Sequence, residues 1–169
     1  MFWCNDRSIY SKGGWNPNGG VTFEPWTSYG MLFSAYNRVV NLKKPSLSCA
    51  RNIDKFTVNS SNGNGALDYP VGLLTADEMM LAGGNINTVN SNFYLYTGKN
   101  YYGMSPNDFS DENAYEFGIT LDGRVHYEGS FGKLTNSYGV RPAISLKASI
   151  SVGGGDGTSS NPYTIDAIS

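Results

Sequence analysis

Five short segments in the second half of the chain have a two-residue period, and this pattern constrains the fold most strongly. They are separated by Gly, Asn, Pro and Asp, which end strands and form turns. We therefore expect a mostly antiparallel sheet from strands at Phe93–Thr97, Tyr101–Ser105, Tyr115–Leu121, Arg124–Glu128 and Val140–Lys147.

The Asp122-Gly123 pair predicts a hairpin whose register follows from the apolar pattern. A two-residue loop would place Ile119 opposite His126. A three-residue loop, with Gly123 left-handed, places Ile119 opposite Val125 and puts His126 on the other face with Gly118. We favour the second register, and we expect His126 to face solvent.

The first half of the chain contains the longest expected helix. Met31, Leu32, Ala35, Tyr36, Val39 and Val40 recur at helical spacing. The pattern predicts a helix over residues 28–42, capped by Ser28 and stopped by Pro45.

A second, shorter helix is predicted by a capping box. Thr75 precedes Glu78 by three residues, so its hydroxyl can accept from the Glu78 amide while the carboxylate reaches back. The helix should run from Ala76 to about Ala82 and end at Gly83-Gly84. An extended segment, Tyr69–Leu74, precedes it.

Charge and composition exclude several classes of partner. The formal net charge of −2 provides no basic stripe for a nucleic acid. No stretch approaches the roughly 20 apolar residues of a membrane span. Charged residues make up only 15% of the chain, which is rich in Gly, Asn and Tyr. That balance is typical of secreted bacterial proteins, so we expect an extracellular or cell-surface location and a chain that is part of a longer surface protein.

The cysteines Cys4 and Cys49 are the chain's only two. In an oxidising compartment they would close a loop of about 45 residues, which stabilises by roughly 4 kcal/mol. We favour this bridge over two unpaired thiols, because both residues lie in the part of the chain that is rich in Gly and Asn. Their number and spacing match no structural zinc site.

Three motifs in order carry a resemblance to a known family. The segment Gly72-Leu73-Leu74-Thr75-Ala76-Asp77-Glu78 resembles the leucine, threonine and acidic-helix signature of formylglycine-generating-enzyme-like domains. Tyr102-Gly103-Met104-Ser105-Pro106 and Gly139-Val140-Arg141-Pro142 are similar to the motifs that close the fold in bacterial surface domains. With a tail like Gly154–Pro162, the chain is most similar to uncharacterised modules in secreted proteins of Gram-positive gut bacteria.

The resemblance implies an α+β domain with the C-type-lectin-like fold. It would have two helices packed on a twisted, mostly antiparallel sheet and much loop. We expect a single domain over residues 1–169, with an amino-terminal part (1–68), the lectin-like core (69–147) and a Gly-rich tail with a last strand (148–169). Arg141 should be internal and structural.

The resemblance brings no catalytic assignment. Formylglycine-generating enzymes use carboxyl-terminal cysteines, and this chain has none after Cys49. The calcium-binding motifs of classical lectins are only partly present in this sequence. Asp108, Asp111 and Glu112 with Asn107 and Asn113 carry the oxygen ligands that calcium prefers, but we favour a solvated acidic loop. We expect no enzyme activity and no cofactor.

The family's recognition face implies where a ligand would bind. Its variable loops correspond to residues 105–115 and 129–138, which are polar and aromatic here. Binding residues concentrate on loops held by a rigid sheet, and tyrosines suit such surfaces. The expected contacts to a glycan or protein ligand are Asn107, Asp108, Phe109, Asp111, Asn113, Tyr115, Asn136 and Tyr138.

We therefore expect an extracellular recognition or adhesion module. The first alternative is a structural subunit or spacer of a bacterial cell-surface protein or filament. A second alternative is the remnant of an enzyme.

Overall fold

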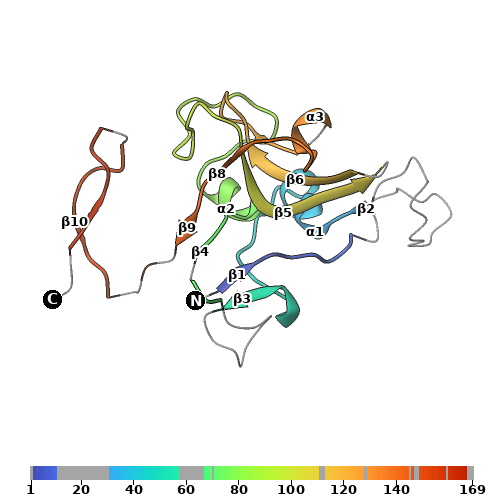
Figure 1. Ribbon diagram of the computed structural model, residues 1–169, viewed down its shortest axis with the longest axis horizontal. Helices are drawn as coiled ribbons and strands as arrows, with labels where there is room; N and C mark the ends of the chain where they lie inside the picture. The colour runs from blue at the N-terminus through green and yellow to red at the C-terminus, as the bar shows by residue number, and fades with distance from the viewer. Residues whose placement is uncertain are drawn as a thin grey trace.

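The computed structural model has an α+β architecture with short helices, mostly antiparallel sheets and much loop (Figure 1). It describes residues 2–10, 31–57, 67–69, 71–110, 113–127, 129–144, 146, 149–158 and 160–166. The helices are α1 (Ser34–Tyr36), the π-helix η1 (Asn37–Asn41), the 3-10 helix η2 (Asn52–Asp54), α2 (Ala76–Leu81) and α3 (Gly129–Gly132). The strands are β1 (Phe2–Cys4), β2 (Met31–Leu32), β3 (Lys55–Thr57), β4 (Val71–Gly72), β5 (Tyr101–Ser110), β6 (Asn113–Ile119), β7 (Val125–His126), β8 (Gly139–Val140), β9 (Ala143–Ile144), β10 (Val152–Gly154) and β11 (Thr164–Ile165).

A five-stranded sheet organises the molecule. Its order is β2-β5-β6-β7, and β8 adds to β5 in parallel. The long β5 and β6 form its centre, with register shifts between Tyr102 and Asp108. Smaller two-stranded sheets are formed by β1 with β3, β4 with β9 and β10 with β11.

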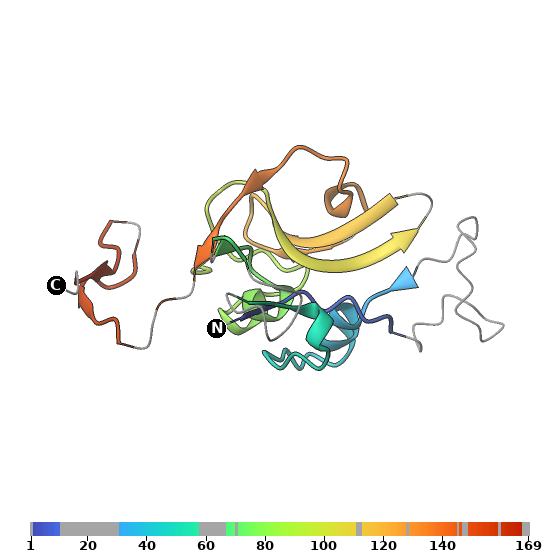
Figure 2. The same ribbon diagram turned by 60° about the horizontal axis from the view of Figure 1, so that its bottom comes forward.

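The core lies between one face of this sheet and the helices α1, η1 and α2. Figure 2 shows these helices on one side of β5 and β6 and the segment containing α3 on the other. The largest apolar side chains with almost no exposed surface come from both layers: Val39, Met79, Phe117, Ile119 and Val125. The face that carries α3 is therefore the outer face of the sheet.

The long helix expected over residues 28–42 is only partly present. Ser28 lies outside the described residues. Met31 and Leu32 are strand β2, paired with Phe109 and Asp108, and helical structure begins at Ser34. The prediction was wrong here because strand pairing with a distant segment outweighs the local helical period.

The capping-box prediction is confirmed. The Thr75 hydroxyl accepts from the Glu78 amide at 3.1 Å, and the Glu78 carboxylate accepts from the Thr75 amide at 2.8 Å. Helix α2 is followed by Gly83 at φ 98°.

The favoured hairpin register is also confirmed. Ile119 pairs with Val125, and Gly118 pairs with His126. Gly123 has a φ of 84°, so it occupies the left-handed region. Its amide donates to the Thr120 carbonyl at 2.9 Å.

The segment Phe93–Thr97 forms turns and no strand. Phe93 and Leu95 are nevertheless buried. The Leu95 carbonyl accepts from the Tyr101 hydroxyl and the Arg141 guanidinium, each at 2.6 Å, so side chains take the place of a neighbouring strand. Arg141 also lies over the Tyr101 ring at 5.6 Å, in the structural role that we expected.

The predicted irregular segment 105–115 is also mostly strand. Residues up to Ser110 belong to β5, and residues from Asn113 belong to β6. The prediction was wrong because the Pro and Asn residues here coincide with register shifts in a continuing strand and do not end it.

The predicted disulfide between Cys4 and Cys49 is present and lies within the amino-terminal part. Strand β1 pairs with β3, and Cys4 lies opposite Lys55. At the other end of the chain, the tail contains a hairpin of β10 and β11 where one strand was expected.

Candidate functional site

Residues 129–138 lie on the outer face of the main sheet. Lys133 forms an isolated bridge with Tyr115, and the Leu134 amide donates to the Ala114 carbonyl at 3.0 Å. The Tyr102 hydroxyl donates to the Lys133 carbonyl. These contacts bring the second predicted recognition segment against the start of β6, next to the end of the first.

Two rings of this segment, Phe131 and Tyr138, meet Tyr102 of β5, and we call these three residues the ring cluster. Phe131 and Tyr138 are stacked, with ring centroids 5.0 Å apart. Tyr102 lies 5.1 Å from Tyr138 and 6.4 Å from Phe131. All three are half-buried, so the cluster presents part of its aromatic surface to solvent.

Gly118 allows Phe131 to approach the sheet. A Cβ atom at this position would lie 3.1 Å from the Phe131 ring and 2.5 Å from the Tyr101 carbonyl oxygen. Glycine in a strand often marks such a close approach. On the neighbouring strand, the His126 ring lies 5.3 Å from Phe131 and extends the aromatic surface.

A hollow of about 330 Å³ adjoins the ring cluster. Its lining combines an aromatic ring, an amide, a hydroxyl and an ion pair: Asn100, Thr120, Leu121, Asp122, Arg124, His126 and Phe131. Its volume lies at the lower end of the range of small-molecule pockets, which is roughly 300–1,000 Å³.

The polar groups of the hollow are held in place by local contacts. The Asp122 carboxylate accepts from the Thr120 hydroxyl and pairs with Arg124 at 2.9 Å, which lowers the pKa of Asp122. His126 Nδ1 contacts the Asn87 side-chain oxygen, and the Asn100 side-chain oxygen accepts from the Leu121 amide at 2.7 Å.

A carboxyl group lies in the sheet close to the ring cluster. Glu116 is opposite Pro106, and burial raises its pKa to about 7. Burial also raises the pKa of Tyr102, with smaller contributions from Tyr138 and Glu116. Glu116 therefore changes charge within the physiological pH range.

The structure brings part of the predicted set of site residues together. Tyr138 belongs to the ring cluster, and Asn136 donates to the Phe131 carbonyl at 3.3 Å. Tyr115 contacts the same segment through Lys133. Asn113 lies at the beginning of β6, three residues before Glu116.

Other predicted site residues lie elsewhere. Asn107 is only 3% exposed, and its side chain donates to the Tyr127 carbonyl at 3.1 Å, so it supports the core. Asp108 and Phe109 pair with β2, and Phe109 is exposed. Asp111 lies outside the described residues, as does Glu112 of the considered calcium loop.

Several residues of the ring cluster and the hollow were missed from the sequence. They come from separated segments: Asn100 and Tyr102 from one, Arg124 and His126 from a second, and Phe131 from a third. The usable signal was Gly118 in a strand, paired with His126 in the favoured register, because a missing side chain there leaves space for a ring.

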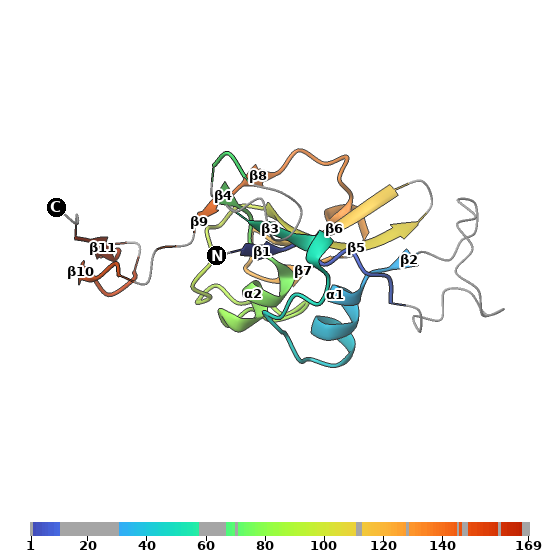
Figure 3. The ribbon, with the colours of Figure 1, turned by 90° about the horizontal axis from the view of Figure 1, so that it is seen from below.

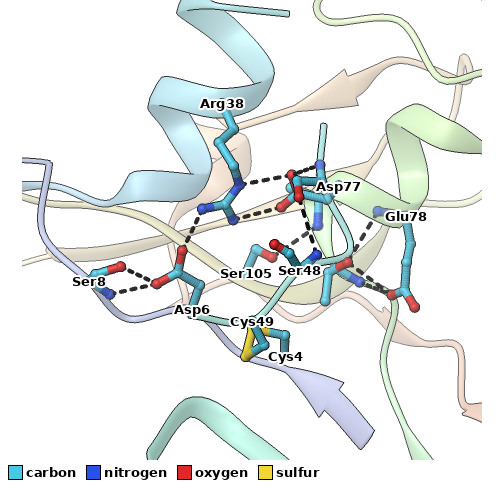
Figure 4. A network of polar contacts seen from close by, with 12 residues as sticks. Cys4, Asp6, Ser8, Arg38, Ser48, Cys49, Asp77, Glu78 and Ser105 are labelled. Carbon is cyan, nitrogen blue, oxygen red and sulfur yellow. Dashed lines mark hydrogen bonds and ion pairs between the residues drawn. A yellow bond between two sulfur atoms is a disulfide. The ribbon is translucent and has the colours of Figure 1, made fainter. Parts of the chain in front are cut away.

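A polar network joins the amino-terminal part to α2 on the other side of the sheet (Figure 4). Arg38 donates to the Asp77 carboxylate from Nε at 2.9 Å and from Nη2 at 2.8 Å, and its Nη1 donates to Asp6. The Ser46 amide donates to Asp77 at 2.8 Å. Burial disfavours the charged form of Asp6, but the hydrogen bonds from Ser8 and Arg38 outweigh this and lower its pKa.

This network borders a second hollow of about 220 Å³, which is also lined by Cys4 and Ser48. The Arg38 and Asp77 side chains are used in their mutual contacts, and the Glu78 carboxylate caps α2. The network therefore has a structural role, and the outer sheet face is the better candidate for a ligand site.

Among the described residues, no group of three His, Cys, Asp or Glu side chains is arranged to hold a metal ion. In the same part of the chain, no helix has both the length and the apolar character needed to cross a membrane. Comparisons with protein-family models, curated proteins and solved structures found no match.

Proposed function

We propose that the chain is an extracellular recognition module that binds a glycan or a protein on the outer face of its main sheet. The observation that carries this proposal is the ring cluster beside the polar hollow. The exposed parts of the rings offer apolar contact, and fixed polar groups at the edge of a hollow offer directed hydrogen bonds. The module acts without a cofactor and without turnover.

The contacts of the site suit recognition because they are already made in the free chain. The Leu134 amide donates to the Ala114 carbonyl and the Lys133 carbonyl accepts from the Tyr102 hydroxyl, so these two bonds hold the 129–138 segment on the sheet. Within the segment, the Asn136 side chain donates to the Phe131 carbonyl. A surface that is ordered before binding loses less conformational entropy when a ligand arrives.

We also propose that this sheet belongs to a C-type-lectin-like fold. Two features support the assignment. The helix with the capping box packs beside β5, and β4, which precedes this helix, pairs with β9, which follows the Arg141-Pro142 motif. The beginning and the end of the proposed lectin-like core (69–147) are therefore joined in one small sheet.

A glycan and protein array screen with the whole chain tests the function. Tyr138→Ala and Phe131→Ala should each weaken the binding found at least tenfold, because each removes a ring of the cluster. Tyr94→Ala is the matched control, since Tyr94 is an exposed tyrosine outside the cluster. Binding that survives both ring substitutions in folded protein would refute this site, and absence of any ligand would favour a structural subunit or spacer.

A further inference from the structure

The segment from Val140 to Leu146 has its apolar side chains directed outward. Val140 is 70% exposed, Ile144 63% and Leu146 49%, and Pro142 is exposed as well. Between them, Arg141 and Ala143 are half-buried. A strand with one solvated face normally shows the reverse pattern, so this face is suited to being covered.

The neighbouring strand extends the same surface. Val71 in β4 pairs with Ile144 in β9 and is 46% exposed. We call Val71, Val140, Pro142, Ile144 and Leu146 the apolar strip. Exposed apolar residues that occur singly need no explanation, but a contiguous set marks an interaction surface.

The β10–β11 hairpin presents a second exposed apolar surface. Val152 pairs with Ile165, and they are 61% and 48% exposed. The turn between the strands is organised by Asp156, which accepts from the Thr158 amide at 3.0 Å. An isolated two-stranded hairpin is marginally stable in water. Packing against another apolar surface would therefore stabilise this hairpin.

The hairpin leaves the strip of its own chain uncovered. Figures 1 and 3 show it beyond β9, apart from the main sheet, and both surfaces keep their exposure in the single chain. One chain thus carries two apolar β surfaces that match in character and do not meet.

We propose that the β10–β11 hairpin of one copy docks on the apolar strip of a second copy. The contact joins two different surfaces, so it is head-to-tail, and it leaves one strip and one hairpin free for further copies. No residue of the strip belongs to the ring cluster, so the two surfaces can be altered by separate substitutions.

Analytical ultracentrifugation of the full chain over a concentration series tests the proposal with two variants. Val140→Ser with Ile144→Ser alters the strip, and Val152→Ser with Ile165→Ser alters the hairpin. The wild-type mass should increase with concentration, and each variant alone should remain a monomer. An equal mixture should form a dimer of one copy of each variant, because one keeps its hairpin and the other keeps its strip.

A matched control replaces two exposed apolar residues elsewhere, Leu42→Ser with Val89→Ser, and should associate like the wild type. If the serine variant does not fold, Val140→Thr with Ile144→Thr gives a second strip variant that keeps the β-branched shape. A wild type that stays monomeric at every concentration would overturn the proposal. So would association by the hairpin variant alone, since the strip would then pair with itself or with another surface.

Discussion

Arg38 and Asp77, which are 39 residues apart in sequence, form two parallel hydrogen bonds of 2.9 and 2.8 Å between guanidinium and carboxylate. Asp77 is almost fully buried, with 4% of its side chain exposed. Its remaining contact is the Ser46 amide. One carboxylate therefore ties η1, the segment before Cys49 and α2 together.

Replacing Asp77 by Asn should destabilise the fold strongly. The change leaves the Arg38 charge half-buried with Asp6 as its remaining carboxylate partner, and breaking a buried pair in this way costs about 3 kcal/mol or more. Urea unfolding followed by circular dichroism measures the loss. Asp122→Asn, in the more exposed pair with Arg124, is the control and should cost less than about 1 kcal/mol.

Removing the disulfide should also lower stability. The bond closes a loop with a sequence separation of 45 residues, for which the chain-entropy estimate is about 4 kcal/mol. The variant with Cys4→Ser and Cys49→Ser should unfold at lower urea concentration, and the reduced wild type should match it. Equal stability of oxidised and reduced protein would contradict this prediction.

Apart from the Cys4–Cys49 disulfide and the structural role of Arg141, the parts of the fold that the sequence predicted are those determined by neighbouring residues. Thr75 and Glu78 form their capping box within one helical turn. The hairpin at Gly123 is fixed by a three-residue turn and by the alternation of Ile119 and Val125. In both cases the residues that decide the structure are close in sequence.

The failures occur where distant residues decide. Met31 and Leu32 fit a helical period but pair with Phe109 and Asp108. Leu95 fits a strand, but its carbonyl is taken by side chains from Tyr101 and Arg141. No local pattern contains this information.

In the candidate site, too, the sequence predicted what local composition decides and missed what distant contacts decide. Asn136 and Tyr138 were predicted because they lie in a polar and aromatic segment of the expected recognition face. Asn107 also lies in a polar and aromatic segment, but strand β5 continues through this segment and the Asn107 side chain is buried. The hollow depends on how the 129–138 segment packs on Gly118, and this packing is not encoded at any single position.

Gly118→Ala should disturb the site directly. The added methyl group would overlap the Tyr101 carbonyl at 2.5 Å and press on Phe131. We expect a loss of roughly 1–3 kcal/mol, as for other overpacked positions, and a reduced near-ultraviolet circular dichroism signal from the aromatic rings. Gly154→Ala is the control, because its nearest contact would be the Thr164 hydroxyl at 3.5 Å. An unchanged spectrum in Gly118→Ala would mean that Phe131 does not rest on this glycine.

Glu116 should make the fold less stable as the pH rises from 4.5 to 7. Burial raises its pKa from the ordinary value of 4.5 to about 7. Within this window the folded state holds a proton that the unfolded chain has released, so the free energy of unfolding falls as pH increases. The stabilisation is complete below pH 4.5 and is lost above pH 7, and the shift corresponds to roughly 3 kcal/mol.

Urea unfolding at several pH values, in a His126→Asn background that removes the imidazole, should show this decrease of the free energy of unfolding with pH. Glu116→Gln in the same background should flatten it, and a slope that persists would assign the effect to another group.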